Sequence, residues 1–387
     1  MKKNKIAYIY LLYTKSSIGV FKKPIQQINS FRNNSKFKNL DIYVLNISKD
    51  EDNNELKYIN VKKSYSQSVF IFLVLFNKLK LIEDHIELNN YSDVIFRYSG
   101  VDRSVVKFAE KNRVFVEIHS KIEDEIFLKL SYKRKFLKKV FLIFKIIMHK
   151  LYFRKFLQNC VGIFCNSNQL KKYLGHSNKT LVVSNGIDNQ NVNITGFMPF
   201  DERILKLGTV ISRADDWHGI QRLIDSFASY NGKINIEIHI IGNVKENYYH
   251  SNNSCSIFYH GVLIGEELDG ILSKLNIGVA PLALYKKRLS ETSALKTVEY
   301  FSRGLPFIIG YKDIISNYII DYKKYVYEVP NDSSLIDIDG LLEFCRSVSI
   351  IHDKVVSEMR NCSEEKLEWD IIFDKYIAHI INSEKKL

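Results

Sequence analysis

The sequence predicts an α/β protein of two doubly wound units, each a parallel sheet covered by helices on both faces. Apolar strand-like runs alternate with helical patterns, and the alternation restarts after a polar stretch at 189–202. Many of these runs are apolar on both faces, as in the strands of a parallel sheet that helices cover on two sides. The 387 residues, of which 46% are hydrophobic, suffice for two such cores.

The expected strands and helices follow the chain in order. Strands of the first unit are expected at 5–12, 41–47, 93–98, 113–119, 161–167 and 180–186, with helices between them that include 105–111 and 169–174. Strands of the second unit are expected at 205–212, 234–242, 255–261, 275–282 and 305–310, with a helix at 219–230 after the first. A last helix is expected within 365–383. We place the domains at 1–190 and 191–365, and we expect the C-terminal helix, 366–387, to pack back on the first.

One stretch, SETSALKTVEYFSRGLPFI at 290–308, gives the sharpest indication of a site. Its apolar spacing predicts a helix that begins near Thr292 and Ser293, both able to cap it, and stops at the following Gly-Leu-Pro. Counted along a helix, Glu291 and Glu299 lie ~12 Å apart, on the order of the span from a sugar across a diphosphate to a ribose. Carboxylates suit hydroxyls, and the positive helix end suits the diphosphate. The stretch predicts a nucleotide-sugar clamp, with two solvated helix acids as the alternative.

Further residues follow the carboxyl ends of other expected strands. Arg213 comes directly after the strand at 205–212, and its planar guanidinium suits phosphate oxygens, with a surface ion pair to a nearby Asp as the alternative. The motif YHGV ends at Val262 and lets backbone approach a nucleotide base, and SNGID begins at Ser184 as a strand followed by a turn. Ligands of such sheets bind at the carboxyl ends of the strands, so we expect the site in the cleft between the units.

In this order, the motifs resemble those of the retaining glycosyltransferases of GT-B fold that are marked by Glu-x7-Glu (glycosyltransferase family 4 and relatives). SALKTVEY is close to the Ser-Pro-Leu-Lys-x-x-Glu-Tyr of many bacterial members, and the likeness is specific over 165–309 and weaker over 1–164. The resemblance implies two Rossmann-like domains that face a cleft. It also implies transfer of a sugar, with retention, from a nucleotide-diphosphate sugar to a glycan or lipid-linked acceptor in surface polysaccharide assembly.

The resemblance assigns the three charged residues of the site by position. Glu291 matches the acid that contacts the donor sugar, and Glu299 matches the acid that binds the ribose. Arg213 matches the basic residue that stabilises the departing diphosphate. Glu291 and Arg213 are therefore expected catalytic residues, together with His119 of the N-terminal half, and Glu299 is expected to bind the donor.

Other positions depart from the family pattern. His218 stands where the family commonly has a lysine, and it can contact a phosphate when protonated or as a neutral donor. Thr292 and Ser293 replace a glycine-rich stretch, so backbone donation survives while the fit to the sugar differs. Lys296 is expected either at the phosphates or on the helix surface.

The N-terminal half offers two weaker candidates. Gly19 resembles the glycine loop that the family places near the phosphates, although the usual double glycine is missing. His119 ends an expected strand and looks like the family's histidine near the transferred sugar, with a satisfied core histidine as the alternative. Glu117 alternates with His119 and therefore shares that face of the strand.

A formal net charge of +13 favours an anionic partner. The segment 129–155 is rich in Lys, Arg and aromatic residues and holds no Asp or Glu. It predicts either a solvated helix face or a helix on an anionic membrane surface. The membrane interpretation involves Lys133, Arg134, Lys135, Lys138 and Lys139. Nucleic acid is not expected as a partner because no recognition module is visible, although a basic nucleic-acid-binding protein remains an alternative.

Two further alternatives concern the chemistry: a sugar-nucleotide epimerase of the same architecture, and a non-catalytic binder of nucleotide sugars. No Asp-x-Asp stands out and the site is cationic, so neither a metal nor a cofactor beyond the nucleotide-sugar co-substrate is expected. The five cysteines show no metal or disulfide spacing, which indicates buried thiols in a reducing compartment. Short apolar runs and the lack of a cleavage site predict a cytoplasmic protein that does not span the membrane. The basic segment would make it peripheral on the inner face of the cell membrane.

Overall fold

The computed structural model describes residues 5–12, 18–32, 34–46, 58–60, 67–131, 136–211, 215–244 and 255–384. The chain divides into two compact units, one of residues 1–183 with 373–387 and the other of residues 184–372. The sequence placed these divisions seven residues later and seven residues earlier, at 190/191 and 365/366. Each unit is a parallel sheet with helices on its faces, so the prediction of two doubly wound α/β units is confirmed.

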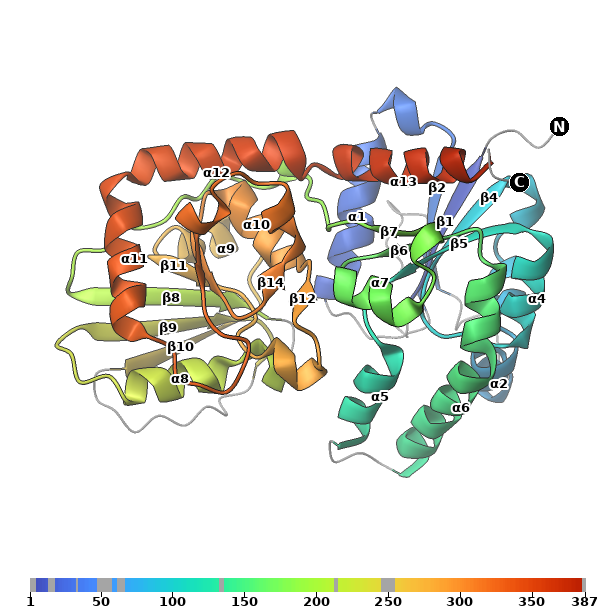
Figure 1. Cartoon of the computed structure of the whole chain (residues 1–387), viewed down its shortest axis with the longest axis horizontal. Helices are drawn as coiled ribbons and strands as arrows, with labels where there is room; N and C mark the ends of the chain where they lie inside the picture. Colours follow the sequence, from blue (N-terminus) through green and yellow to red (C-terminus); the bar gives the residue numbers. More distant parts are fainter. Residues whose placement is uncertain are drawn as a thin grey trace. The chain divides into compact units, whose positions relative to one another are not determined.

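The first unit holds a seven-stranded sheet in the order β3-β2-β1-β4-β5-β6-β7 (Figure 1). The chain builds outward from β1 through β2 and β3 and then crosses to β4, so the order reverses between β1 and β4. Its strands are β1 (Ile6–Leu12), β2 (Leu40–Asn46), β3 (Tyr58–Asn60), β4 (Asp93–Arg97), β5 (Arg113–Ile118), β6 (Gly162–Cys165) and β7 (Thr180–Val182). Its helices are α1 (Ile18–Arg32), α2 (Gln67–Phe76), α3 (Lys78–Glu83), α4 (Arg103–Lys111), α5 (Ile122–Ser131), α6 (Phe136–Asn159), α7 (Asn168–Leu174) and most of α13 (Trp369–Glu384).

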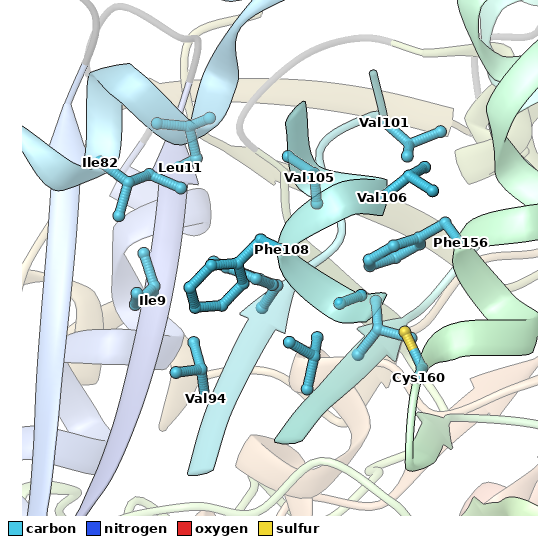
Figure 2. Packing of buried hydrophobic residues seen from close by; sticks show 14 of the residues in the cluster. Ile9, Leu11, Ile82, Val94, Val101, Val105, Val106, Phe108, Phe156 and Cys160 are labelled. Atoms are coloured by element: carbon cyan, nitrogen blue, oxygen red, sulfur yellow. The ribbon is translucent and has the colours of Figure 1, made fainter. Parts of the chain in front are cut away.

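One face of this sheet is closed by α3, α4 and α6. Figure 2 shows Phe108 of α4 pointing onto the sheet near Ile9 and Val94, with Phe156 and Cys160 beside it. Strand residues on this face alternate with residues on the other, as the period of two requires. On this face, the apolar strand residues and the helices above them form one hydrophobic core.

The opposite face is covered by α1 and the C-terminal helix α13, whose aromatic side chains pack on one another and on the sheet. In Figure 1 the first turns of α13 (red) lie next to one end of α1 (blue), and the ring of Phe373 lies 5.0 Å from that of Phe31. Tyr376 stacks on Phe164 of β6 at 4.1 Å between ring centroids. Such aromatic pairs add to the free energy of apolar burial, so the last helix is an integral part of the first unit.

The second unit holds a six-stranded parallel sheet in the order β10-β9-β8-β11-β13-β15, and a two-stranded sheet of β12 and β14. The order reverses between β8 and β11, which is therefore its switch point. The strands are β8 (Ile204–Val210), β9 (Asn235–Ile241), β10 (Cys255–Gly261), β11 (Ile277–Val279), β12 (Glu291–Thr292), β13 (Phe307–Ile309), β14 (Lys312–Asp313) and β15 (Val326–Glu328). The helices are α8 (Ile220–Ala228), α9 (Gly265–Leu272), α10 (Leu295–Arg303), α11 (Ile338–Ile350) and α12 (His352–Lys366).

The single C-terminal helix expected over 365–383 is wrong in one respect: α12 ends before α13 begins, and two residues separate them. The backbone there pairs with Ile187 instead of continuing the helix. Ile187 donates its N–H to the Leu367 carbonyl at 2.8 Å, and Trp369 donates its N–H to the Ile187 carbonyl at 3.0 Å. The Leu367 carbonyl and the Trp369 N–H are used in these bonds and are not available for hydrogen bonds within a continuous helix, so the helix breaks here.

Candidate functional site

The carboxyl ends of β8 and β11 mark the switch point of the second unit, and α10 is tied to it. The Thr209 hydroxyl donates to the Val279 carbonyl at 2.9 Å and accepts from Lys296 Nζ at 2.8 Å. Burial lowers the pKa of Lys296 to about 7, against the attraction of Glu299, which raises it. Because ligands of open α/β sheets bind at the switch point, a lysine held there is suited to an anionic ligand.

The N-terminus of α10 differs from the prediction. The helix begins at Leu295 with Ala294 as its cap residue, and no side chain caps it, so the expected capping by Thr292 or Ser293 is wrong. Thr292 lies in β12, and the Ser293 hydroxyl accepts the N–H of Asn185 at 2.9 Å. Since no side chain caps this end, the N–H groups of the first turn are available to an anion.

The two glutamates of the motif lie in different elements. Glu291 is in β12 rather than in a helix, so the ~12 Å helical spacing does not apply. It is 6% exposed, and its Oε1 lies 3.7 Å from Lys312 Nζ. Glu299, in α10 and also 6% exposed, accepts from Arg303 Nε at 3.2 Å. Neither residue is a solvated surface acid, so the alternative of two solvated helix acids fails.

The loop after β8 carries the next group of predicted residues. Arg213 lies outside the described residues. His218 is buried, and its ring lies 3.9 Å from that of Trp217 at a tilt of 31°. Its carbonyl accepts the N–H of Leu282 at 3.0 Å. Gly219 adopts φ 73°, and a Cβ at this position would lie 2.8 Å from Leu282 Cβ. This close approach fixes the loop after β8 against the end of β11, beside the switch point.

The motifs SNGID and YHGV lie at different parts of the second unit. Asn185, in SNGID, donates its Nδ2 to the Ser293 carbonyl at 2.7 Å, so this motif supports the start of α10. Val262, at the end of YHGV, is 50% exposed and follows the edge strand β10, two strands away from β8. Nothing in these contacts tests a role for Val262 in binding the base.

In the first unit, a buried carboxylate is the centre of the predicted histidine site. Glu117 is completely buried near the end of β5. Five side chains from five segments surround its two oxygens: Tyr8 of β1, Lys23 of α1, Arg97 of β4, His119 after β5 and Tyr376 of α13. A buried charge is costly without such partners, and here one carboxylate faces two cations.

The charges of this cluster set the protonation of His119. Its Nε2 lies 2.6 Å from Glu117 Oε1 and 3.5 Å from Lys23 Nζ. Burial lowers the pKa of His119 to about 3, with Arg97 and Lys23 acting in the same direction and Glu117 opposing them. The cations hold the pKa of Glu117 well below its usual range, against the effect of burial. The imidazole is therefore neutral at neutral pH, and the carboxylate is ionised.

Sequence reasoning missed most of this cluster. Arg97 ends β4 directly opposite Glu117 in the parallel register, so two charged residues at neighbouring strand ends were an available signal. Lys23 and Tyr376 come from helices on the covered face, and no sequence spacing indicates their approach. Gly19 lies in the first turn of α1 rather than in a loop, and its proposed role near phosphates is not tested.

The described residues of the basic segment belong to the end of α5 and to α6. The residues 132–135 between them, which include Lys133, Arg134 and Lys135, lie outside the described part of the chain. Lys138 and Lys139 lie in the first turns of α6, and Lys139 is exposed. None of the helices within the described ranges is both long and apolar enough to cross a membrane.

Comparison with known proteins identifies the fold. No protein-family model matches the chain, and no curated protein matches it by sequence. Among solved structures, it is similar to a glycosyltransferase from Rickettsia africae (TM-score 0.64, 14% identity, all of both chains). It is also similar to the lipopolysaccharide outer core galactosyltransferase WaaB (0.59, 15%, 98% of this chain and 99% of that one) and to Anabaena HepE with UDP and glucose (0.59, 11%, 98% and 100%). The chain has the GT-B fold of these glycosyltransferases.

Proposed function

We propose that this protein is a glycosyltransferase that moves a sugar, with retention, from a nucleotide-diphosphate sugar to a glycan or lipid-linked acceptor. The observation that carries the proposal is the group at the switch point of the second unit. There α10 begins without a side-chain cap, and Lys296 of its first turn donates to Thr209 of β8. The buried acid Glu291 lies just before this helix, in the short strand β12. The shared fold supports the same class of reaction, since HepE was crystallised with UDP and glucose.

The cationic groups of this site suit the leaving diphosphate. Negative charge develops on the diphosphate as the glycosidic bond breaks, and preorganised donors stabilise it. The first-turn N–H groups of α10 and the Lys296 ammonium supply such donors, and we assign Arg213 and His218 to the same task. These donors need no metal ion to neutralise the diphosphate, which supports transfer without a metal or other cofactor.

The acids suit the hydroxyls of the two sugars. A carboxylate accepts two charge-assisted hydrogen bonds from neighbouring hydroxyls. We assign Glu291 to the transferred sugar and Glu299 to the ribose, as the resemblance implies. The hydrogen bond from Arg303 Nε, at 3.2 Å, orients the Glu299 carboxylate. Thr292 and Ser293 border the sugar, and their backbone groups contribute there.

An anionic membrane surface is the partner that α2 and α6 fit. The two helices pack against each other, and the Phe76 and Phe144 rings lie 6.4 Å apart (Figure 1). Exposed large apolar side chains of these helices are Val69, Phe72, Phe76, Phe136, Ile143, Phe144, Ile147 and Leu151. Exposed basic side chains of α6 are Lys139, Lys150, Arg154 and Lys155. Apolar groups rimmed by cations suit the interface of an anionic leaflet and would place a lipid-linked acceptor near the enzyme on its cytoplasmic side.

A stabilisation screen tests donor binding. A ligand that binds only the folded state stabilises it by about 2.7 kcal/mol at one hundred times its dissociation constant, so UDP-, GDP- and ADP-sugars can be ranked by thermal shift. We expect one class to stabilise the protein and Arg213→Ala to lose that shift. Arg203→Ala is the matched control, because Arg203 is exposed at the opposite end of the same strand. The proposal fails if no nucleotide sugar stabilises the wild type, or if both variants respond alike.

A further inference from the structure

The cluster around Glu117 fixes which nitrogen of His119 carries the proton. Of the two contacts of Nε2, the one to Glu117 Oε1 at 2.6 Å is a hydrogen bond, and the one to Lys23 Nζ at 3.5 Å is at the limit of that range. An ionised carboxylate can only accept, so Nε2 must carry the hydrogen. A neutral imidazole with a hydrogen on Nε2 has its lone pair on Nδ1.

The Glu117 carboxylate, which accepts this hydrogen, has further partners on both of its oxygens. Lys23 Nζ and Tyr376 Oη donate to Oε1, and the latter bond measures 2.9 Å. The Tyr8 hydroxyl donates to Oε2, and Arg97 Nη1 lies 3.3 Å from that oxygen. With its oxygens engaged by these partners, the carboxylate cannot turn away from the imidazole without losing several of them.

We propose that Glu117 is the positioning residue of His119: it accepts the Nε2 hydrogen and so makes Nδ1 the nitrogen that accepts a hydrogen bond from a substrate hydroxyl. Resting on the glycosyltransferase function proposed above, this inference makes His119 an acceptor and excludes it as a proton donor to the leaving group. Among the described residues, Nδ1 has no hydrogen-bond partner within the protein. Tyr376 ties the same carboxylate to α13, so the last helix of the chain supports this histidine.

The protonation state agrees with the geometry. The charged and titratable groups that face the pair are Tyr8, Tyr10, Lys23, Arg97 and Tyr376. Burial and the two cations keep the imidazole neutral, with a pKa of about 3, and this outweighs the attraction of Glu117. A histidine of this kind does not change its charge between pH 5 and 8, where an ordinary histidine does.

Two-bond ¹H–¹⁵N correlation spectra of the full-length protein, labelled in its histidines, report the tautomer directly. The chain has 10 histidines, so the His119 signals are assigned as the set that His119→Gln removes. We expect the wild type to show a hydrogen on Nε2, a bare Nδ1, and no titration between pH 8 and 5. Glu117→Gln should give a mixture of tautomers or a titration nearer 6.5, with His379→Gln as a control that leaves the His119 pattern unchanged.

The wild-type spectrum decides the inference even if Glu117→Gln does not fold. A hydrogen on Nδ1, a charged imidazole at pH 7, or a His119 pattern that a folded Glu117→Gln protein retains would overturn it. The readout needs no substrate, so it separates this inference from the proposed function. A protein with the expected tautomer that cleaves no nucleotide sugar would contradict the glycosyltransferase assignment and leave the Glu117–His119 relation standing.

Discussion

Lys296 is the group through which nucleotide binding should depend most clearly on pH. Burial lowers the pKa of its ammonium to about 7 in the free protein. A diphosphate over the first turn of α10 brings negative charge close to Nζ, which favours the ammonium and raises that pKa. Binding should therefore take up a proton wherever the free lysine is neutral.

The lowered pKa of Lys296 sets the size of this effect. At pH 8 a group with a pKa of about 7 is protonated in roughly one molecule in eleven, and at pH 6 in roughly ten of eleven. Binding should take up about 0.9 proton at pH 8 and about 0.1 proton at pH 6. The same linkage should weaken the affinity about tenfold between pH 6 and pH 8, because the lysine must be protonated before it binds the diphosphate.

Isothermal titration calorimetry in buffers of different ionisation enthalpy measures the proton uptake. A nucleotide sugar is the suitable ligand, because its diphosphate does not titrate between pH 6 and 8. Lys296→Met should bind more weakly with no uptake, and Lys296→Arg should bind well with no uptake, since arginine stays charged. Lys274→Met, which removes an exposed lysine of the same unit, should behave like the wild type. Equal uptake at both pH values in the wild type, or unchanged uptake in Lys296→Met, would refute the reasoning.

Two further predictions concern stability and the membrane. Burial raises the pKa of Asp313 to about 7, so the folded state holds this proton more tightly than the unfolded chain. The free energy of unfolding of the wild type should fall from about pH 4 to pH 7 relative to Asp313→Asn, on the order of 1 kcal/mol per pH unit, and urea unfolding curves that stay parallel would contradict this. Phe72→Ser with Phe144→Ser should abolish most flotation with anionic vesicles, because each phenylalanine contributes about 1.5–3 kcal/mol when it leaves water. Ile350→Ser, at a position 83% exposed on the second unit, is the control, and equal flotation of both variants would count against the membrane surface.

Periodicity sufficed for the fold because both sheets are built from runs that are apolar on two faces. All the strands expected from the sequence are present. The helix α10 ends at Arg303, directly before the Gly-Leu-Pro as predicted, and Gly304 caps it in the left-handed conformation with φ 69°. The strands that were missed, β3, β12, β14 and β15, are two or three residues long and too short to show a period. The break before Trp369 was not predictable, since a tertiary pairing with Ile187 causes it.

The candidate site was only partly predictable for a related reason. Glu291, Lys296 and Glu299 are close in the chain, so a local motif reveals them. The start of α10 was misplaced because Ser293 bonds to Asn185, which lies 108 positions earlier in the chain. The partners of Glu117 come from segments up to 259 positions away, and only the fold brings Tyr376 to it. Distant side chains that meet on one carboxylate leave no spacing in the sequence.

Release of nucleoside diphosphate from a bound nucleotide sugar, with NMR analysis of the freed or transferred sugar, measures the proposed reaction itself. We expect the wild type to release the diphosphate and to form first a product with the anomeric configuration of the donor. Glu291→Gln should still bind the donor but should release the nucleoside diphosphate at least about a hundredfold more slowly, as expected when an interaction with the transition state is lost. A folded wild type that cleaves no UDP-, GDP- or ADP-sugar, or that yields only an isomeric nucleotide sugar, would contradict the account.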